Sequence, residues 1–443
     1  MNYYQQLKYL IMNPTENRWD YYKCHERETV ESIFEYPSQF IELTFLHAKK
    51  DILKSSVADG KYRFNVQKIS SSRAAHSISS LFLGFILSDG LMRGNLNQFC
   101  SFENTKIKYP FTYVWNLTSL YHDFGYQYEQ DNSLRERIVT KLGNASQGSM
   151  RCKYVSIDSL KKELDVKHSI WTPSFYYRKR YTPNRLHNDG RLVETMGELS
   201  DKNAIEKYIC DNSKYFRCNG RKVRIPSITS SKTSKYLHYR LCGCPYSQCV
   251  DHGIAGGVVF YDLIIKNYLH EFSKKKAYCR NVNIHEFTIR SILDKDLRFG
   301  IDQTILFSYI ADCIIKHNIW KADGDTEEIY RHYGLDDLIG DAYEKINFHK
   351  NPLLFILCMS DTLEPYKNFH RNVLGSSMGD VEYQKDNVKQ IFEKYSIAVD
   401  EDRIVVTVPQ DWIDSFKEKL NGMTKWLDIR YTDIGQEFVI EIL

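Results

Sequence analysis

Apolar residues fill nearly every position in several separate stretches of the chain. Residues 73–88 are apolar or small on almost all faces of a helix, and residues 301–317 and 352–361 have the same character. A helix that is hydrophobic all round lies in the core of a protein. The apolar runs 113–120 and 258–265 are shorter, and we expect them to be helical as well. The pattern therefore predicts a set of buried helices and a fold that is mainly α.

The N-terminal part and the middle of the chain have a different pattern. Residues 1–60 are expected to form a helical extension, with turn signals at Asn13-Pro14 and Asp59-Gly60. Residues 126–249 are polar and contain few long apolar runs. We expect this polar middle part to lie outside the core.

Residues 386–443 predict a small α+β module. Their pattern alternates between short runs of strand-forming residues and one amphipathic run. The expected elements are a strand over 403–408, a helix over 409–422, and strands over 427–432 and 437–443.

Composition and charge are those of an ordinary soluble protein. The 443 residues include 60 Lys and Arg against 56 Asp and Glu, and a net charge of +4 does not predict nucleic-acid binding. The start of the sequence is polar, unlike a secretory signal, and the longest apolar runs are shorter than a membrane span. The 11 cysteines are scattered, which favours reduced thiols. We expect a cytoplasmic protein without a membrane partner.

Six imidazole and carboxylate side chains lie on or beside the apolar stretches. A buried carboxylate is costly unless it is paired or binds a metal. Imidazole and carboxylate together suit a divalent ion, and six such ligands are enough for two ions. In chain order the six are His76, His122, Asp123, His252, His317 and Asp361.

His252 stands at the head of a run of very small residues, Gly253 to Gly257. Each glycine in this run lowers the helix propensity. Such a loss is expected where a neighbouring helix, or a metal and its ligand, must come very close to the backbone.

The order and the local sequences of these residues resemble the HD superfamily of metal-dependent phosphohydrolases. Arg73-Ala-Ala-His76-Ser is similar to the first motif of the family, and Tyr121-His122-Asp123-Phe-Gly125 to the motif that names it. His252-Gly253-x-x-Gly256 and Ile314-Ile-Lys-His317 resemble the additional histidines of the binuclear branch, which includes diadenosine tetraphosphate hydrolases and HD-type nucleotide phosphodiesterases. Ser360-Asp361-Thr-Leu-Glu364-Pro365-Tyr-Lys367 is similar to the last motif of the tetraphosphate hydrolases.

The resemblance implies an HD-type helical bundle core over residues 61–125 and 250–385, with two divalent metal ions. Iron and manganese are expected first, and magnesium, cobalt, nickel and zinc are alternatives. A hydroxide that bridges the two ions would attack the phosphorus atom in line. The implied ligands are His76, His122, Asp123 and Asp361 for one ion, and His252 and His317 for the second, with Asp123 bridging.

Basic side chains next to the expected ligands are candidates for contacts with substrate phosphates. Lys316 and Lys367 are assigned to the catalytic group with His122 and Asp123. Arg73 and Arg371 are assigned to substrate binding.

Residues 126–249 are expected to form an inserted cap, because compact members of the family need a much shorter connection between His122 and His252. Family members commonly have a lysine soon after the His-Asp pair, where this chain has Tyr126. Residues 171–185 interleave aromatic and cationic side chains that can stack on bases and neutralise phosphates. The candidates there are Tyr176, Tyr177, Arg178 and Arg180.

Five cysteines between Cys210 and Cys249 leave a structural zinc site open as a further possibility. Their spacing does not match the paired Cys-x2-Cys of common zinc sites. We therefore expect the cysteines to have another role.

The sequence as a whole predicts a nucleotide phosphohydrolase that cleaves a phosphoanhydride or phosphodiester bond. Nucleoside triphosphates or dinucleoside polyphosphates are the preferred substrates, and a cyclic nucleotide or cyclic oligonucleotide is the alternative. A nucleotide sensor without turnover is a second class of function, and a nuclease or RNA-binding protein that uses residues 171–185 is a third. A homo-oligomer is compatible with all three.

Overall fold

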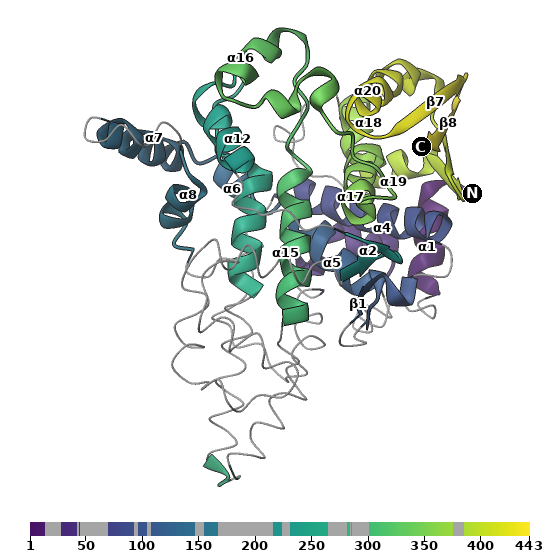
Figure 1. Cartoon of the computed structure of the whole chain (residues 1–443). Helices are drawn as coiled ribbons and strands as arrows, with labels where there is room; N and C mark the ends of the chain where they lie inside the picture. Colours follow the sequence, from purple (N-terminus) through teal and green to yellow (C-terminus); the bar gives the residue numbers. More distant parts are fainter. Residues whose placement is uncertain are drawn as a thin grey trace.

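The long helix α4, Ser71–Leu91, is the central element of the computed structural model (Figure 1). Ser70 caps its first turn, and nearly all side chains from Ala74 to Leu87 are buried. Further apolar helices pack around α4 or around one another. They are α5, Phe111–Tyr121, the helix His252–Ile264, α15, Ile301–Lys316, and α17, Pro352–Leu363. The predicted buried helices are therefore confirmed, with ends that differ by a few residues.

The part of the chain that the structure describes is mainly α, with two small antiparallel sheets. This confirms the coarse fold class expected from the sequence. The structure describes residues 1–13, 28–41, 44, 70–92, 96–103, 108–146, 155–166, 216–223, 231–264, 281–283, 285, 301–374 and 385–443.

The remaining helices surround this core. Figure 1 shows α7 and α8 beside α12, on the opposite side of the molecule from the C-terminal sheet. The α-helices are α1, Tyr3–Met12, α2, Val30–Glu35, α6, Tyr126–Glu129, α7, Asn132–Ser146, α8, Ile157–Glu163, α12, Ser231–Cys242, α16, Glu327–His332, α18, Pro365–Leu374, α19, Lys385–Lys394, and α20, Ile413–Trp426. Short 3-10 turns lie at Leu96–Gln98, Gly324–Thr326, Asp336–Leu338, Gly340–Ala342 and Gln410–Trp412.

Two glycines allow core helices to lie unusually close together. A Cβ atom at Gly84 would lie 2.1 Å from the Trp115 ring, whose Nε1 donates a 2.8 Å hydrogen bond to the Leu81 carbonyl. A Cβ atom at Gly257 would lie 2.6 Å from the Ala311 carbonyl oxygen on α15. The small residues after His252 thus admit a neighbouring helix, one of the two reasons expected for them.

The first sheet joins the core to the residues of the expected insertion. Its strand order is β2-β1-β3-β4, and all neighbouring strands are antiparallel. Cys100 on β1 is paired in register with Cys218 on β3. The strands are β1, Cys100–Phe102, β2, Lys108–Tyr109, β3, Phe216–Cys218, and β4, Arg221–Lys222.

The C-terminal module has the order β5-β6-β8-β7, with α20 between β6 and β7 in the chain. The predicted strands and helix are confirmed, and β5 and α19 precede them. β5 packs against α4, where Gly90 lies next to Val399. The strands are β5, Ser396–Asp400, β6, Arg403–Thr407, β7, Ile429–Ile434, and β8, Glu437–Ile442.

The N-terminal helix α1 contacts both the core helix α4 and the helix α19, which precedes the C-terminal sheet. The Tyr3 hydroxyl donates a 2.7 Å hydrogen bond to the Ser79 carbonyl on α4, and its ring packs edge-on against Phe392 on α19. α1 therefore packs on the core next to the C-terminal module.

One helix among the described residues, α4, is long and apolar enough to cross a membrane. However, 83% of its most apolar window is buried inside the protein. Such burial is typical of the core helix of a soluble protein.

Candidate metal centre

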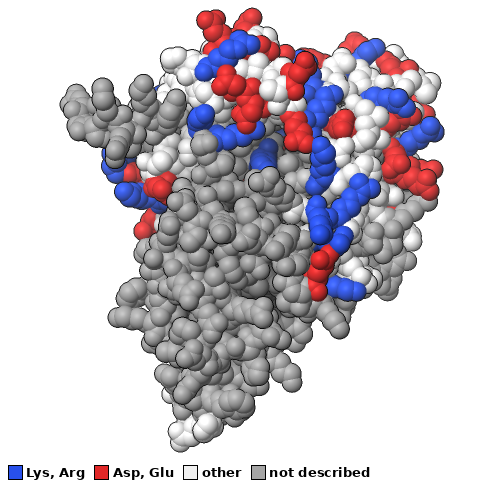
Figure 2. Space-filling model, in the orientation of Figure 1, with Lys and Arg blue, Asp and Glu red and all other residues white. Residues whose placement is uncertain are grey.

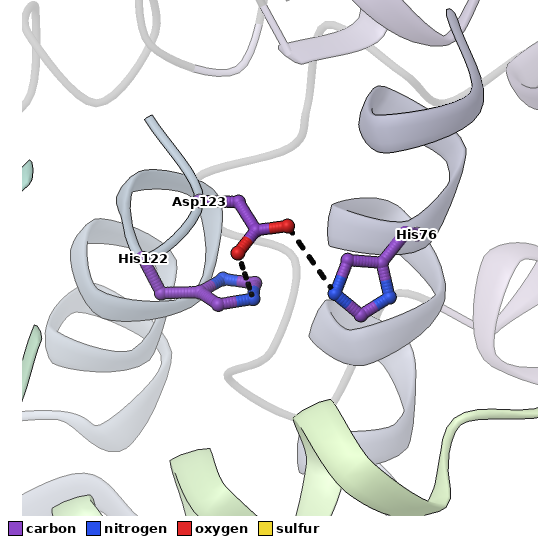
Figure 3. A group of neighbouring side chains, drawn as sticks. All are labelled: His76, His122 and Asp123. Carbon is purple, nitrogen blue, oxygen red and sulfur yellow. Dashed lines mark ion pairs between the residues drawn. The ribbon is translucent and has the colours of Figure 1, made fainter. Parts of the chain in front are cut away.

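The expected ligands come from the ends of different helices and meet in the core. His76 lies in the second turn of α4, and His122 and Asp123 directly follow α5. Figure 3 shows these three side chains directed toward one another from two neighbouring segments. His252 is the first residue of the helix His252–Ile264, and His317 directly follows α15. Asp361 lies near the end of α17.

The first group surrounds the Nε2 atoms of two histidines. His76 Nε2 lies 2.9 Å from Asp361 Oδ1 and 3.4 Å from Asp123 Oδ2. His122 Nε2 lies 3.3 Å from Asp123 Oδ1 and 3.5 Å from Asp361 Oδ1. Two imidazole nitrogens and two carboxylates thus converge on one small volume.

The second group shares Asp123 with the first. Asp123, His252 and His317 each offer one ligand atom, and these atoms lie within 4.8 Å of one another. The same holds for His76, His122 and Asp123. His252 Nε2 lies 4.0 Å from Asp123 Oδ1, and the His252 and His317 rings are 5.3 Å apart. Two ions are therefore compatible with the arrangement, with Asp123 between them.

The Nδ1 atom of each of the four histidines lies at hydrogen-bond distance from an oxygen atom. His122 Nδ1 and His317 Nδ1 each lie 2.5 Å from a backbone carbonyl oxygen, of Ser119 and Ile314 respectively. A carbonyl oxygen only accepts, so Nδ1 carries the proton and Nε2 keeps its lone pair for a metal. His76 Nδ1 and His252 Nδ1 each lie 2.6 Å from a carboxylate, of Glu364 and Glu129 respectively.

Three polar atoms at the centre form no hydrogen bond of normal geometry within the described part of the chain, although they lie at ion-pair distance from other members of the group. They are His76 Nε2, His122 Nε2 and Asp123 Oδ2. His76 and His122 are fully buried, and Asp123 is 2% exposed. Buried polar atoms are almost always satisfied, so three unsatisfied atoms that face one another fit a bound cation.

The protonation states also suit a cation. Burial, together with the nearby His122 and His252, lowers the pKa of His317 to about 3 and leaves this imidazole neutral. Burial disfavours the charge of Asp123, but His122, His76 and Arg73 outweigh it and hold the pKa of that carboxyl well below its usual value. The centre therefore offers a neutral imidazole and an ionised carboxylate at neutral pH.

His76 differs from the other ligands. Its burial lowers the pKa, but the Glu364 and Asp361 carboxylates outweigh that effect and raise the pKa to about 9. In the absence of an ion the imidazole holds a proton, which a metal must displace in order to bind.

Two of the expected phosphate-binding cations lie at this centre. Lys367 Nζ lies 2.8 Å from Asp361 Oδ1, and Arg73 Nη1 lies 3.6 Å from Asp123 Oδ2. The Arg73 guanidinium also covers the Tyr126 ring at 3.1 Å from its centroid. On its other side Tyr126 stacks on His252, with ring centroids 3.9 Å apart. Tyr126 thus links the cation to the second histidine group.

Lys316 is not brought together with these residues. Its Nζ lies 3.0 Å from Asp312 Oδ2, and its side chain lines a cavity that contains none of the six expected ligands. Arg371 belongs to α18, but its side chain lies outside the described part of the structure. The cap residues Tyr176, Tyr177, Arg178 and Arg180 also lie outside the described residues.

The cysteines of the expected insertion do not form a metal site among the described residues. Cys210 lies outside them, and neither of the candidate metal groups includes a cysteine. Instead, Arg240 donates hydrogen bonds to Cys249 Sγ at 3.1 Å and to Cys244 Sγ at 3.5 Å. The same arginine lies 3.4 Å from Glu129, the carboxylate that holds His252.

Two supporting carboxylates were not among the residues expected from the sequence. Glu364 belongs to the motif that contains Asp361, so its position was available as a signal, whereas Glu129 follows no recognisable motif. Asp251 provides further support, because it accepts a 2.6 Å hydrogen bond from Asn318 and lies 3.4 Å from Arg240. The second histidine group is therefore held by a network that includes residues of the expected insertion.

Replacing either supporting carboxylate with its amide is expected to weaken metal binding. Loss of such a partner typically lowers metal affinity roughly 10–100-fold. Glu129→Gln should lower the affinity for one of the two expected ions, and Glu364→Gln the affinity for the other. Competition with a chelator of known affinity measures both. Glu418→Gln, at an exposed position of helix α20, is the matched control. Equal affinities in all three variants would contradict the assigned roles.

No protein-family model, no curated protein and no solved structure matches this chain.

Proposed function

We propose that the protein is a metal-dependent phosphohydrolase of the HD type that acts on a nucleotide. The observation that carries the proposal is the buried pair of His/Asp groups that share Asp123. The Nε2 atoms of His76 and His122 and the Oδ2 atom of Asp123 support it, because they face one another without a hydrogen bond of normal geometry among the described residues and fit a divalent cation. Iron or manganese suits this mixed set of nitrogen and oxygen ligands.

Divalent ions held by these residues would supply a strong nucleophile at neutral pH and would stabilise the charge that develops on a phosphoryl group. The chain itself contributes the orientation of the ligands. The Ser119 and Ile314 carbonyls hold His122 and His317 in the tautomer that presents Nε2. Because the site is buried, the interactions within it are stronger than they would be in water.

The cations at the metal centre, Lys367 and Arg73, would bind the phosphates of the substrate. Lys367 and Arg73 stand beside Asp361 and Asp123, so a phosphoryl group near those carboxylates comes within reach of both cations. Arg73 is held in place by Tyr126, which reduces the entropy lost when it binds phosphate. An anionic substrate with several phosphates is therefore preferred over a neutral one.

A substrate panel tests the proposal. The purified chain, loaded with Mn²⁺, Fe²⁺, Co²⁺ or Mg²⁺, is offered nucleoside triphosphates, dinucleoside polyphosphates, cyclic nucleotides and cyclic oligonucleotides. We expect hydrolysis of nucleoside triphosphates or dinucleoside polyphosphates to be the fastest. If no nucleotide is hydrolysed with any of these metals, the enzymatic proposal is wrong. Stabilisation of the protein by a nucleotide without product would instead favour a sensor.

Replacement of Lys367 tests substrate binding separately from metal binding. Lys367→Met should lower kcat/KM by roughly 10²–10³-fold, the usual cost of removing one donor that stabilises transition-state charge. Lys425→Met removes a half-exposed lysine that is paired with Asp323, and should leave kcat/KM unchanged. Metal content is measured in both variants. A loss of metal as large as the loss of activity would show that Lys367 acts through Asp361 and not through the substrate.

A further inference from the structure

A cavity of about 960 Å³ lies beside α15 and contains none of the six expected metal ligands. Its walls come from the β3–β4 hairpin, the start of α12, the C-terminal half of α15 and residues 337–354. A cavity of this size accommodates a small organic ligand.

Positive charge dominates the lining of this cavity. Figure 2 shows Lys and Arg side chains gathered in a column in the right half of this view, with fewer acidic side chains between them. Six cations line the cavity against three carboxylates. The cations are Arg221, Lys222, Lys232, Lys316, Lys345 and Lys350.

Only half of these cations are neutralised within the cavity. The ion pairs are Lys316–Asp312 at 3.0 Å, Lys232–Asp337 at 2.6 Å and Lys350–Glu344 at 2.5 Å. Within the ranges that the structure describes, no carboxylate lies at ion-pair distance from Arg221, Lys222 or Lys345. Three uncompensated cations thus face a shared concave space.

The walls between the cations are partly apolar. Val223, Leu338 and Leu354 line the cavity and are each at most 4% exposed. Low-dielectric walls around charges of one sign concentrate the electrostatic potential and attract counter-ions. A ligand with an anionic end and an organic body matches both parts of the lining.

We propose that this cavity binds a small organic anion that carries two or more phosphate groups. Lys and Arg are suited to phosphate oxygens through charge-assisted hydrogen bonds, and the three cations without an ion pair among the described residues match the charge of a di- or triphosphate. The site lies on α15, which carries Lys316 at the cavity and is followed directly by His317 at the metal centre. Ligand binding here does not require the hydrolytic activity proposed above.

Isothermal titration of the full chain, treated with chelator to remove metal, tests the site with ATP and with inorganic triphosphate. Both should bind with saturation, and ATP should bind more tightly because its organic part contacts the apolar walls. The Arg221→Ala/Lys222→Ala double variant should weaken binding by ~10-fold or more. The Lys8→Ala/Lys162→Ala variant removes the same charge from exposed helix positions outside the cavity, and should bind as the unaltered chain does.

Three results would overturn the site. The first is the absence of saturable binding, and the second is equal weakening in the two double variants, which would indicate non-specific attraction. The third is loss of binding in Lys367→Met with full binding in Arg221→Ala/Lys222→Ala, because the ligand would then occupy the metal centre. None of these results contradicts nucleotide hydrolysis by the metal-loaded chain, and the absence of hydrolysis would not exclude binding in the cavity, so the two proposals fail separately.

Discussion

Asp123→Ala is expected to remove both metal ions and, with them, all hydrolysis of nucleotides. Asp123 is the one residue common to the two groups of ligand atoms, and its Oδ1 lies 3.3 Å from His122 Nε2. Its Oδ2 lies 3.4 Å from His76 Nε2, and its Oδ1 lies 4.0 Å from His252 Nε2. Elemental analysis of protein purified without chelator should give two equivalents of metal for the unaltered chain and close to none for the variant.

A second variant makes this result specific. His317→Ala removes a ligand of one group only, so it should leave about one equivalent of metal bound. Both substitutions also remove a buried polar side chain, which can change the stability of the fold. Thermal unfolding in the presence of chelator shows whether each variant is still folded. A folded Asp123→Ala protein with its full metal content would show that Asp123 does not bridge two ions.

The six candidate ligand positions could be predicted from the sequence because each is a polar side chain in an apolar stretch. An imidazole or a carboxylate on an otherwise apolar helix stands out by its cost of burial. The structure places all six in one core region, as Asp361 illustrates by approaching both His76 and His122. Their assignment to particular ions remains a prediction.

The supporting contacts have no such local signal, because the sequence does not show which histidine each carboxylate reaches, even for Glu364 in the motif of Asp361. Glu364 reaches His76 across 288 residues of sequence, and Glu129 reaches His252 across 123. The pairing of Cys100 with Cys218 spans 118 residues and joins the expected insertion to the core. Tertiary packing decides these contacts, and hydrophobic periodicity carries no information about them.

The helix α19, in contrast, has a local signal in the sequence. In α19 the buried residues Val388, Ile391 and Phe392 follow helical spacing. Tyr126 is a different case, since the sequence alone shows only that it stands where members of the HD superfamily, which the motifs resemble, commonly have a lysine. Its ring lies between Arg73 and His252, so the cation at this place comes from α4.

Gly125→Ala is expected to destabilise the protein and to weaken the second metal group selectively. The backbone of Gly125 has a φ of −71° and a ψ of −13°, which any residue adopts, so the effect is one of space alone. A Cβ atom there would lie 1.9 Å from the His252 carbonyl oxygen and 2.8 Å from the Gly256 nitrogen. Both are backbone atoms, so the helix His252–Ile264 must move away from Asp123. Overpacking of this kind costs about 1–3 kcal/mol, and a backbone clash favours the upper end.

Gly422→Ala on α20 provides the matched control, because nothing lies within 4 Å of its added Cβ atom. This substitution should be neutral or stabilise the protein by up to about 1 kcal/mol, since alanine favours a helix over glycine. Chemical denaturation and metal analysis of both variants separate the two effects. We expect Gly125→Ala to retain the ion held by His76 and His122 while losing the one held by His252 and His317. Equal stability of the two variants would show that the close approach of these backbones is not needed for folding, and unchanged metal content would show that it does not position His252.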